Sequence, residues 1–141
     1  MPIVFNFQTS FSFSNRKPIR SWIQNSIIHM GKTPGEINYV FCTNAYILEI
    51  NKKFLNHDYT TDIITFDYSE QSLINGEIYI SIDEVKENAK HFKVSFQDEL
   101  HRVLIHGILH LLGFDDQSII DKKNMKRMEN KLLSSYKFIL L

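Results

Sequence analysis

Residues 101–118 read HRVLIHGILHLLGFDDQS, an apolar stretch that carries two histidines four residues apart, then a glycine and two aspartates. Ser95, with Asp98 three residues later, forms a capping-box-like start for a helix that contains this stretch. Gly113 provides a C-terminal stop. We therefore predict a helix that continues to Leu112 and ends just before the two aspartates.

The segments on the N-terminal side of this helix alternate between strand and helix patterns. Apolar residues alternate in residues 3–13, which predicts a strand with a bend near residues 9–10. Residues 15–31 predict an amphipathic helix, with Asn15 as N-cap and Gly31 as the stop. Its predicted buried positions are Ile19, Trp22, Ile23 and Ile27.

The middle of the chain predicts one strand, one helix and a pair of strands. Residues 36–43 read as a strand, and Asn44 can cap a helix through about Phe54. The expected buried positions of that helix are Ile47, Leu48 and Phe54. Residues 62–68 and 76–82 are rich in β-branched and aromatic residues, which predicts two adjacent strands.

Two further helices complete the expected fold. Residues 83–92 predict a short, mostly polar helix, and residues 118–135 an amphipathic helix that buries Met125, Met128 and Leu132. The chain has 141 residues and 43% hydrophobic content, which suits one compact domain over residues 1–141. We expect an α+β domain in which about five helices cover a mixed sheet of about four strands.

Composition restricts the function classes. The net charge is zero, which argues against a nucleic-acid binder that depends on a large overall positive field. Basic residues are nevertheless concentrated in residues 1–35 and 121–131. Cys42 is the single cysteine, there is no signal segment, and no apolar run approaches the roughly 18 residues of a membrane span. We therefore expect a cytoplasmic protein without a membrane partner.

The two histidines of the opening stretch point to a metal site. His106 and His110 project from one helix face within about 40° of each other. Neutral imidazole is a good ligand for zinc, nickel or copper, so the pair offers half of a tetrahedral site. The competing interpretation is a pair of core histidines that hydrogen-bond to backbone or carboxylate groups.

A third ligand can come from the residues after the helix. Gly113 can adopt a positive φ angle, which lets the chain turn back so that Asp115 or Asp116 reaches the two histidines. Three protein ligands with an open fourth position are typical of a catalytic zinc site, which lowers the pKa of bound water to about 7. The pattern thus favours a hydrolase.

Gly107 directly follows the first histidine, where a metzincin peptidase carries its general-base glutamate. The absence of that carboxylate makes a peptidase the weaker alternative. Glycine costs about 1 kcal/mol relative to alanine inside a helix. Close approach of a substrate or another backbone, or packing of the helix against the sheet, would each explain its presence.

The stretch HGILHLLGFDD resembles the signature H-G-x-L-H-L-x-G-Y-D-H of the YbeY family of bacterial metal-dependent endoribonucleases. TDIITF at 61–66 is similar to the family's T-D-V-L-S-F strand, and GEIYIS at 76–81 to its G-D-I-x-I-S strand. MKRMENKLL resembles its M-x-x-x-E helix. These motifs occur in the family's order and cover about residues 44–133.

The resemblance implies that His106, His110 and Asp116 are the metal ligands, with Asp116 at the position of the family's usual third histidine. The residues alone do not separate Asp115 from Asp116. A carboxylate adds negative charge and should make bound water less acidic. The resemblance implies one divalent metal ion, with zinc expected and nickel the alternative.

Leu55 stands where the family carries an arginine, and leucine cannot contact phosphate. Lys52, Lys53 and His57 are the candidates that could compensate at an RNA-binding surface, although each also suits an ordinary exposed position. His101 lies about 140° around the helix from His106, so we exclude it as a ligand.

The implied function is cleavage of single-stranded RNA in ribosomal RNA maturation and ribosome quality control, with ribosomal RNA or ribosomal subunits as partners and no DNA partner. Asp62 and Asp115 are candidates for the general base because they flank motif positions, although each also suits a turn or cap. The alternatives are a ribosome-associated RNA-binding protein with a structural metal, and another metallohydrolase such as a peptidase or esterase.

Overall fold

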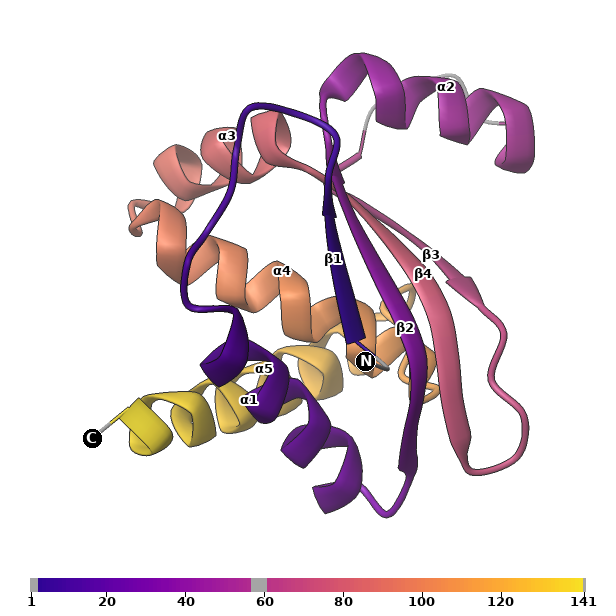
Figure 1. The fold of residues 1–141 in the computed structure, drawn as a ribbon, viewed down its shortest axis with the longest axis vertical. Helices are drawn as coiled ribbons and strands as arrows, with labels where there is room; N and C mark the ends of the chain where they lie inside the picture. The colour runs from indigo at the N-terminus through magenta and orange to yellow at the C-terminus, as the bar shows by residue number, and fades with distance from the viewer. Residues whose placement is uncertain (1–2, 57–60, 141) are drawn as a thin grey trace.

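The computed structural model describes residues 3–56 and 61–140, the last four of these as backbone only. Four strands and five helices make up this described part of the chain, which confirms the expected α+β class (Figure 1). In chain order the elements are β1 (Ile3–Phe7), α1 (Arg16–His29), β2 (Thr33–Cys42), α2 (Asn44–Leu55), β3 (Ile63–Asp67), β4 (Leu73–Ser81), α3 (Ile82–Phe92), α4 (Phe96–Leu111) and α5 (Ile119–Leu140).

The four strands form one mixed sheet in the order β1-β2-β4-β3. Strands β1, β2 and β4 are parallel, whereas β3 pairs with β4 in the antiparallel sense. The predicted pair of adjacent strands is therefore confirmed. Parallel neighbouring strands cannot be joined by a hairpin and require a crossover connection. Helix α1 is part of the crossover from β1 to β2, and α2 and β3 lie between the parallel neighbours β2 and β4 in the chain.

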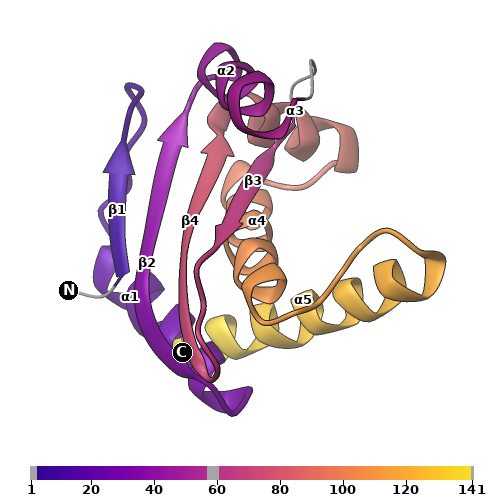
Figure 2. The ribbon, with the colours of Figure 1, turned by 90° about the vertical axis from the view of Figure 1, so that its right-hand side faces the viewer.

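The helices lie on both faces of the sheet. In Figure 1, α1, α3, α4 and α5 lie on one side and α2 on the other, and Figure 2 shows α2 above the ends of β2 and β4. The large core forms between the sheet and α1, α4 and α5, where Ile78 and Ile80 are fully buried. Cys42, Ile47 and Ile64 form a smaller core beneath α2.

The first strand is shorter than predicted. Strand β1 ends at Phe7, which pairs with Phe41, and β2 ends one residue later at Cys42. No backbone partner in β2 therefore remains for a strand through Phe11 and Phe13. Their alternating aromatic rings instead pack against the core from a loop, with the Phe13 ring 5.2 Å from the ring of Phe5.

Helix α2 differs from the prediction at its start and in its buried face. Thr43 is the N-cap, because its hydroxyl accepts a hydrogen bond from the Tyr46 amide at 3.2 Å, and Asn44 is the first helical residue. Ile47 is buried as predicted, but Phe54 is 58% exposed. The predicted burial of Phe54 is wrong because the small core of α2 lies around Ile47, near the start of the helix.

Helices α1 and α5 pack against each other beside the core. All four predicted positions of α1 are at most 1% exposed, and the Trp22 indole donates a 2.8 Å hydrogen bond to the Leu132 carbonyl. In α5, Met125 and Leu132 are buried as predicted and Met128 is partly buried. No helix among the described residues combines the length and apolarity needed to cross a membrane.

Helix α4 packs directly on the sheet through Gly107. Ser95 caps the helix as predicted, since its hydroxyl accepts from the Asp98 amide at 3.0 Å. A Cβ atom on Gly107 would lie 3.0 Å from methyl groups of both Ile63 and Ile78. Of the two explanations for this glycine, packing against the sheet is therefore the one that the structure supports.

We expect Gly107→Val to lower the free energy of unfolding by about 1–3 kcal/mol, because its methyl groups would overpack the contact with Ile63 and Ile78. The measurement is urea denaturation followed by circular dichroism. Ala45→Val at an exposed position of α2 is the control and should cost no more than about 0.5 kcal/mol. Equal midpoints for the two variants would contradict this account of Gly107.

Candidate metal centre

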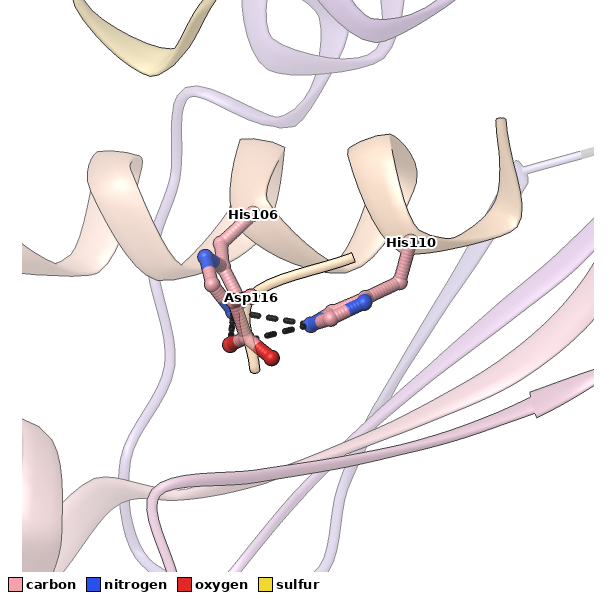
Figure 3. Close-up of side chains that lie close together, drawn as sticks. All are labelled: His106, His110 and Asp116. Atoms are coloured by element: carbon pink, nitrogen blue, oxygen red, sulfur yellow. Dashed lines mark hydrogen bonds and ion pairs between the residues drawn. The ribbon is translucent and has the colours of Figure 1, made fainter. Parts of the chain in front are cut away.

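The two histidines of α4 point into one site on the side of the helix, as Figure 3 shows. The Nε2 atoms of His106 and His110 are 3.0 Å apart. Their side chains are 20% and 22% exposed, so both are largely shielded from water while their Nε2 edges converge. This arrangement follows from their spacing of four residues on one helix.

Asp116 completes the cluster from the turn after α4. Gly113 has a φ angle of +98°, and the amide of Phe114 returns to the Leu109 carbonyl at 2.9 Å, which reverses the chain direction. The Asp116 Oδ2 atom lies 3.3 Å from His106 Nε2 and 3.5 Å from His110 Nε2. Potential ligand atoms of all three residues lie within 4.8 Å of one another.

Asp115 has a different role in the same turn. Its Oδ1 atom accepts a 2.8 Å hydrogen bond from the backbone amide of Asp116. This is the turn-residue interpretation that the sequence allowed for Asp115. The structure thus distinguishes the two adjacent aspartates: the carboxylate of Asp116 faces the histidines, whereas that of Asp115 holds the backbone of the turn.

A buried carboxylate on α5 orients the first histidine. The Oε2 atom of Glu129 lies 2.6 Å from Nδ1 of His106, and its Oε1 atom accepts a 2.8 Å hydrogen bond from Arg102. Glu129 is only 6% exposed, so the Arg102 guanidinium compensates its charge. An ionised carboxylate can only accept a hydrogen bond, which places the His106 proton on Nδ1 and leaves a lone pair on Nε2.

The second histidine is oriented in the same way by the backbone. Nδ1 of His110 lies 3.1 Å from the Phe114 carbonyl oxygen, which also only accepts. Both Nε2 lone pairs therefore face each other and the Asp116 carboxylate, an arrangement in which three electron donors converge. Such a set of two imidazoles and one carboxylate fits a divalent metal ion of the zinc type.

Burial and the surrounding charges together shift the pKa values of three groups. Burial lowers the pKa of His106, but the Glu129 hydrogen bond and the nearby carboxylates outweigh it, and the net shift is upward. Burial raises the pKa of Asp62, against the lowering effect of His106. Burial also raises the pKa of Glu99, to about 7, although the Arg102 charge opposes this shift.

Asp62, one of the two predicted general-base candidates, is near enough to two of the candidate ligands to interact with them electrostatically. Its Oδ2 atom accepts a 3.3 Å hydrogen bond from the Asn88 amide group of α3. The charges of His106 and Asp116 act on its pKa. Asn88 is therefore a partner that holds the Asp62 carboxylate in place.

Other predicted residues lie elsewhere. Lys52 and Lys53 are exposed in the last turn of α2, which covers the opposite face of the sheet from α4. Leu55 is 40% exposed at the end of the same helix, and His57 is outside the described residues. His101 packs its ring 4.8 Å from that of Tyr136, so it points away from the cluster as predicted.

The sequence reasoning missed Glu129, Arg102 and Glu99. Glu99 and Arg102 precede His106 by seven and four residues, so the helical period places them on the histidine face of α4. That spacing was a usable signal. Glu129 comes from a different helix, and although the M-x-x-x-E resemblance contained it, only the packing of α5 on α4 reveals its partner.

We expect Glu129→Gln to weaken zinc binding about 10- to 100-fold, because the amide cannot hold the His106 tautomer as a buried carboxylate does. Zinc titration against a chelating dye measures the affinity, and a thermal melt checks that the variant folds. Glu49→Gln, at an exposed position of α2, is the control. Unchanged zinc affinity in Glu129→Gln would show that Glu129 does not position the ligand.

We also expect Glu99→Gln to stabilise the metal-free protein increasingly as pH rises. A pKa raised to about 7 by burial means that the folded state favours the protonated acid, so the wild type loses stability between the ordinary pKa of 4.5 and about 7. Glutamine removes this loss. The test compares the urea midpoints of wild type and Glu99→Gln in the presence of chelator at pH 5 and pH 8. The control is Glu87→Gln, at an exposed position of α3. A stability gain of Glu99→Gln that is the same at both pH values, or the same as that of the control, would contradict the prediction.

Comparisons with known proteins identify the family of this chain. The model of the family described as "Endoribonuclease YbeY" matches residues 4–137. Endoribonuclease YbeY of Flavobacterium psychrophilum is 46% identical over 95% of this chain and 96% of its own, and that of Porphyromonas gingivalis is 48% identical over 84% and 78%. The solution structure of TM1509 from Thermotoga maritima covers 96% of this chain and 91% of its own, with a TM-score of 0.62 and 26% identity. This chain belongs to the endoribonuclease YbeY family.

Proposed function

We propose that this protein is a metal-dependent endoribonuclease, a hydrolase that cleaves phosphodiester bonds within RNA. The observation that carries the proposal is the convergence of two imidazole Nε2 atoms from α4 and the Asp116 carboxylate from the turn that follows it. Membership of the endoribonuclease YbeY family supports the choice of RNA as substrate. A peptidase is not favoured, because Gly107 packs on the sheet where a metzincin would place its base.

His106, His110 and Asp116 would hold one divalent ion, for which we propose zinc, with nickel as the alternative. When bound, such an ion supplies a Lewis acid that polarises a phosphoryl oxygen and lowers the pKa of water. Glu129 and the Phe114 carbonyl keep both Nε2 atoms available by holding the protons on Nδ1. These two contacts pre-organise the ligand set.

For the proton acceptor we propose Asp62 rather than Asp115. Asp62 is held by Asn88 and interacts electrostatically with His106, and burial raises its pKa, which makes it a better base. Asp115, in contrast, is exposed to solvent, and its carboxylate holds the turn through its hydrogen bond from the Asp116 amide. In this proposal an Asp62 carboxylate oxygen accepts a proton from the attacking water as the water oxygen bonds to phosphorus. The bond from phosphorus to the leaving ribose oxygen breaks, and that oxygen takes up a proton from solvent.

The proposed substrate is single-stranded ribosomal RNA, within ribosomal subunits or their precursors, so that the protein would act in ribosomal RNA maturation and quality control in the cytoplasm. Residues 1–141 would form one metallohydrolase domain for this purpose. Lys52, Lys53 and His57 stay candidates for RNA contacts on α2 and the segment that follows it. Family membership and the exposure of both lysines support this part of the proposal.

Elemental analysis and an RNA cleavage assay test the function together. We expect zinc-loaded wild type to hold about one metal equivalent and to cleave single-stranded RNA, because three ligands are sufficient for a catalytic site. His110→Ala and Asp116→Ala should lose the metal and reduce cleavage by two orders of magnitude or more, on the order of other catalytic-site losses.

The control for this test is Asp115→Ala, which removes the adjacent carboxylate that does not face the histidines. It should retain the metal and fold normally. If Asp115→Ala loses the metal while Asp116→Ala keeps it, the ligand assignment is wrong. If the metal-loaded wild type cleaves no RNA with either zinc or nickel, the proposed activity fails.

A further inference from the structure

A groove of about 560 Å³ opens beside the candidate metal centre. His106 and Asp116 line it together with residues of α3, α4 and α5, and we call it the α3–α5 groove. In Figure 2, α3 lies near the upper end of α4, and α5 runs below α4 and extends to the right. The groove is therefore continuous with the site where we propose that RNA is cleaved.

One wall of the groove is apolar and exposed. Phe92, the last residue of α3, is 59% exposed, and Val94 is 43% exposed two residues later. Lys93 between them adopts a left-handed conformation with a φ angle of +57°, which ends the helix. An exposed phenylalanine ring in a groove offers a flat apolar surface on which a planar ring can stack.

Helix α5 contributes positive charge to the groove. Lys122 and Lys126 line the groove from α5, four residues apart on one helix face, and both are exposed. No ion pair links either ammonium group to another residue that the structure describes. Arg102 also lines the groove, but its guanidinium is engaged by Glu129 and Asn130. The two lysines are thus the cations available to a ligand.

The carboxylates in the groove leave this positive charge effective. Glu129 is buried and paired with Arg102. Glu99 is only 4% exposed, and its pKa of about 7 means that a large fraction of its carboxyl groups is neutral near pH 7. The third carboxylate, Asp116, is partly exposed, and its Oδ2 atom faces the two histidines. Lys122 and Lys126 therefore supply the exposed positive charge of the groove.

We propose that the α3–α5 groove binds an unpaired nucleotide of the RNA strand next to the cleaved bond, with its base stacked on Phe92 and its phosphates on Lys122 and Lys126. This inference rests on the proposed endoribonuclease function and deepens it by placing single-strand selectivity in this groove. Base stacking on aromatic side chains requires a base that is not already stacked within a duplex. The two lysines also supply positive charge for phosphate binding, which Leu55, at the position of the family's arginine, cannot supply.

The test uses the full-length protein and a fluorescein-labelled 12-nucleotide single-stranded RNA, with binding measured by fluorescence anisotropy in chelator so that no cleavage occurs. We expect Phe92→Ala to weaken binding roughly tenfold or more, as for other base-stacking residues. In the Lys122→Ala/Lys126→Ala double variant, the slope of the logarithm of the binding constant against the logarithm of the salt concentration should be smaller in magnitude by about 1.4, the value for two lost phosphate contacts. Wild type should bind a 12-base-pair RNA duplex more weakly than the single strand.

Matched controls exist for both kinds of change. Tyr68→Ala removes an aromatic ring that is 56% exposed but lines a hollow shared with Val4 and Asn6 rather than this groove. Lys123→Ala/Lys131→Ala removes two exposed lysines from α5 that do not line the groove. Both controls should bind the single strand nearly as the wild type does. Thermal melts confirm that all variants fold.

The outcomes separate this inference from the proposed function. If wild type cleaves RNA but Phe92→Ala and the lysine pair bind single-stranded RNA no differently from their controls, the groove proposal is overturned and the endoribonuclease proposal stands. If these variants lose binding while the metal-loaded wild type cleaves nothing, the groove is an RNA site and the cleavage proposal fails. A wild type that binds no single-stranded RNA overturns the groove proposal.

Discussion

The close contact between Gly107 of α4 and the methyl groups of Ile63 and Ile78 determines how the rest of the site is built. A glycine at this point lets the helix backbone approach the sheet closely. Once this face of α4 lies on the sheet, the helical period turns His106 and His110 toward the side of the helix, where they are shielded but not fully buried. The position of the candidate ligands is thus a consequence of backbone packing.

The second requirement is that two other elements meet this helix face. The turn at Gly113 returns the chain so that Asp116 reaches both Nε2 atoms, and α5 packs so that Glu129 reaches the opposite edge of the His106 ring. Carboxylates therefore lie on both edges of one imidazole, one as a candidate ligand and one as its orienting partner. Arg102 makes the buried carboxylate tolerable, because an unpaired buried charge would be strongly destabilising.

Errors in the sequence-based fold have one common physical cause. Alternation of Phe11 and Phe13 predicted a continued strand, yet a strand needs a partner, and β2 ends at Cys42. Apolar spacing predicted burial of Phe54, yet the core beneath α2 lies around Ile47. In each case the apolar residues have the expected spacing, but the length of the neighbouring strand or the position of the neighbouring core determines whether they pair or become buried.

The sequence by itself determined the element order, the helix that carries His106 and His110, and the turn that follows it, because helical period, capping and glycine conformation are local properties. The spacing of the residues left Asp115 and Asp116 as alternatives, and only the family resemblance favoured Asp116. The tertiary structure gives the physical distinction, because the Asp116 carboxylate faces the histidines whereas that of Asp115 accepts a hydrogen bond within the turn. It also revealed the pairing of Glu129 with His106 and the groove between α3 and α5. These depend on contacts between residues far apart in the chain, which no local pattern specifies.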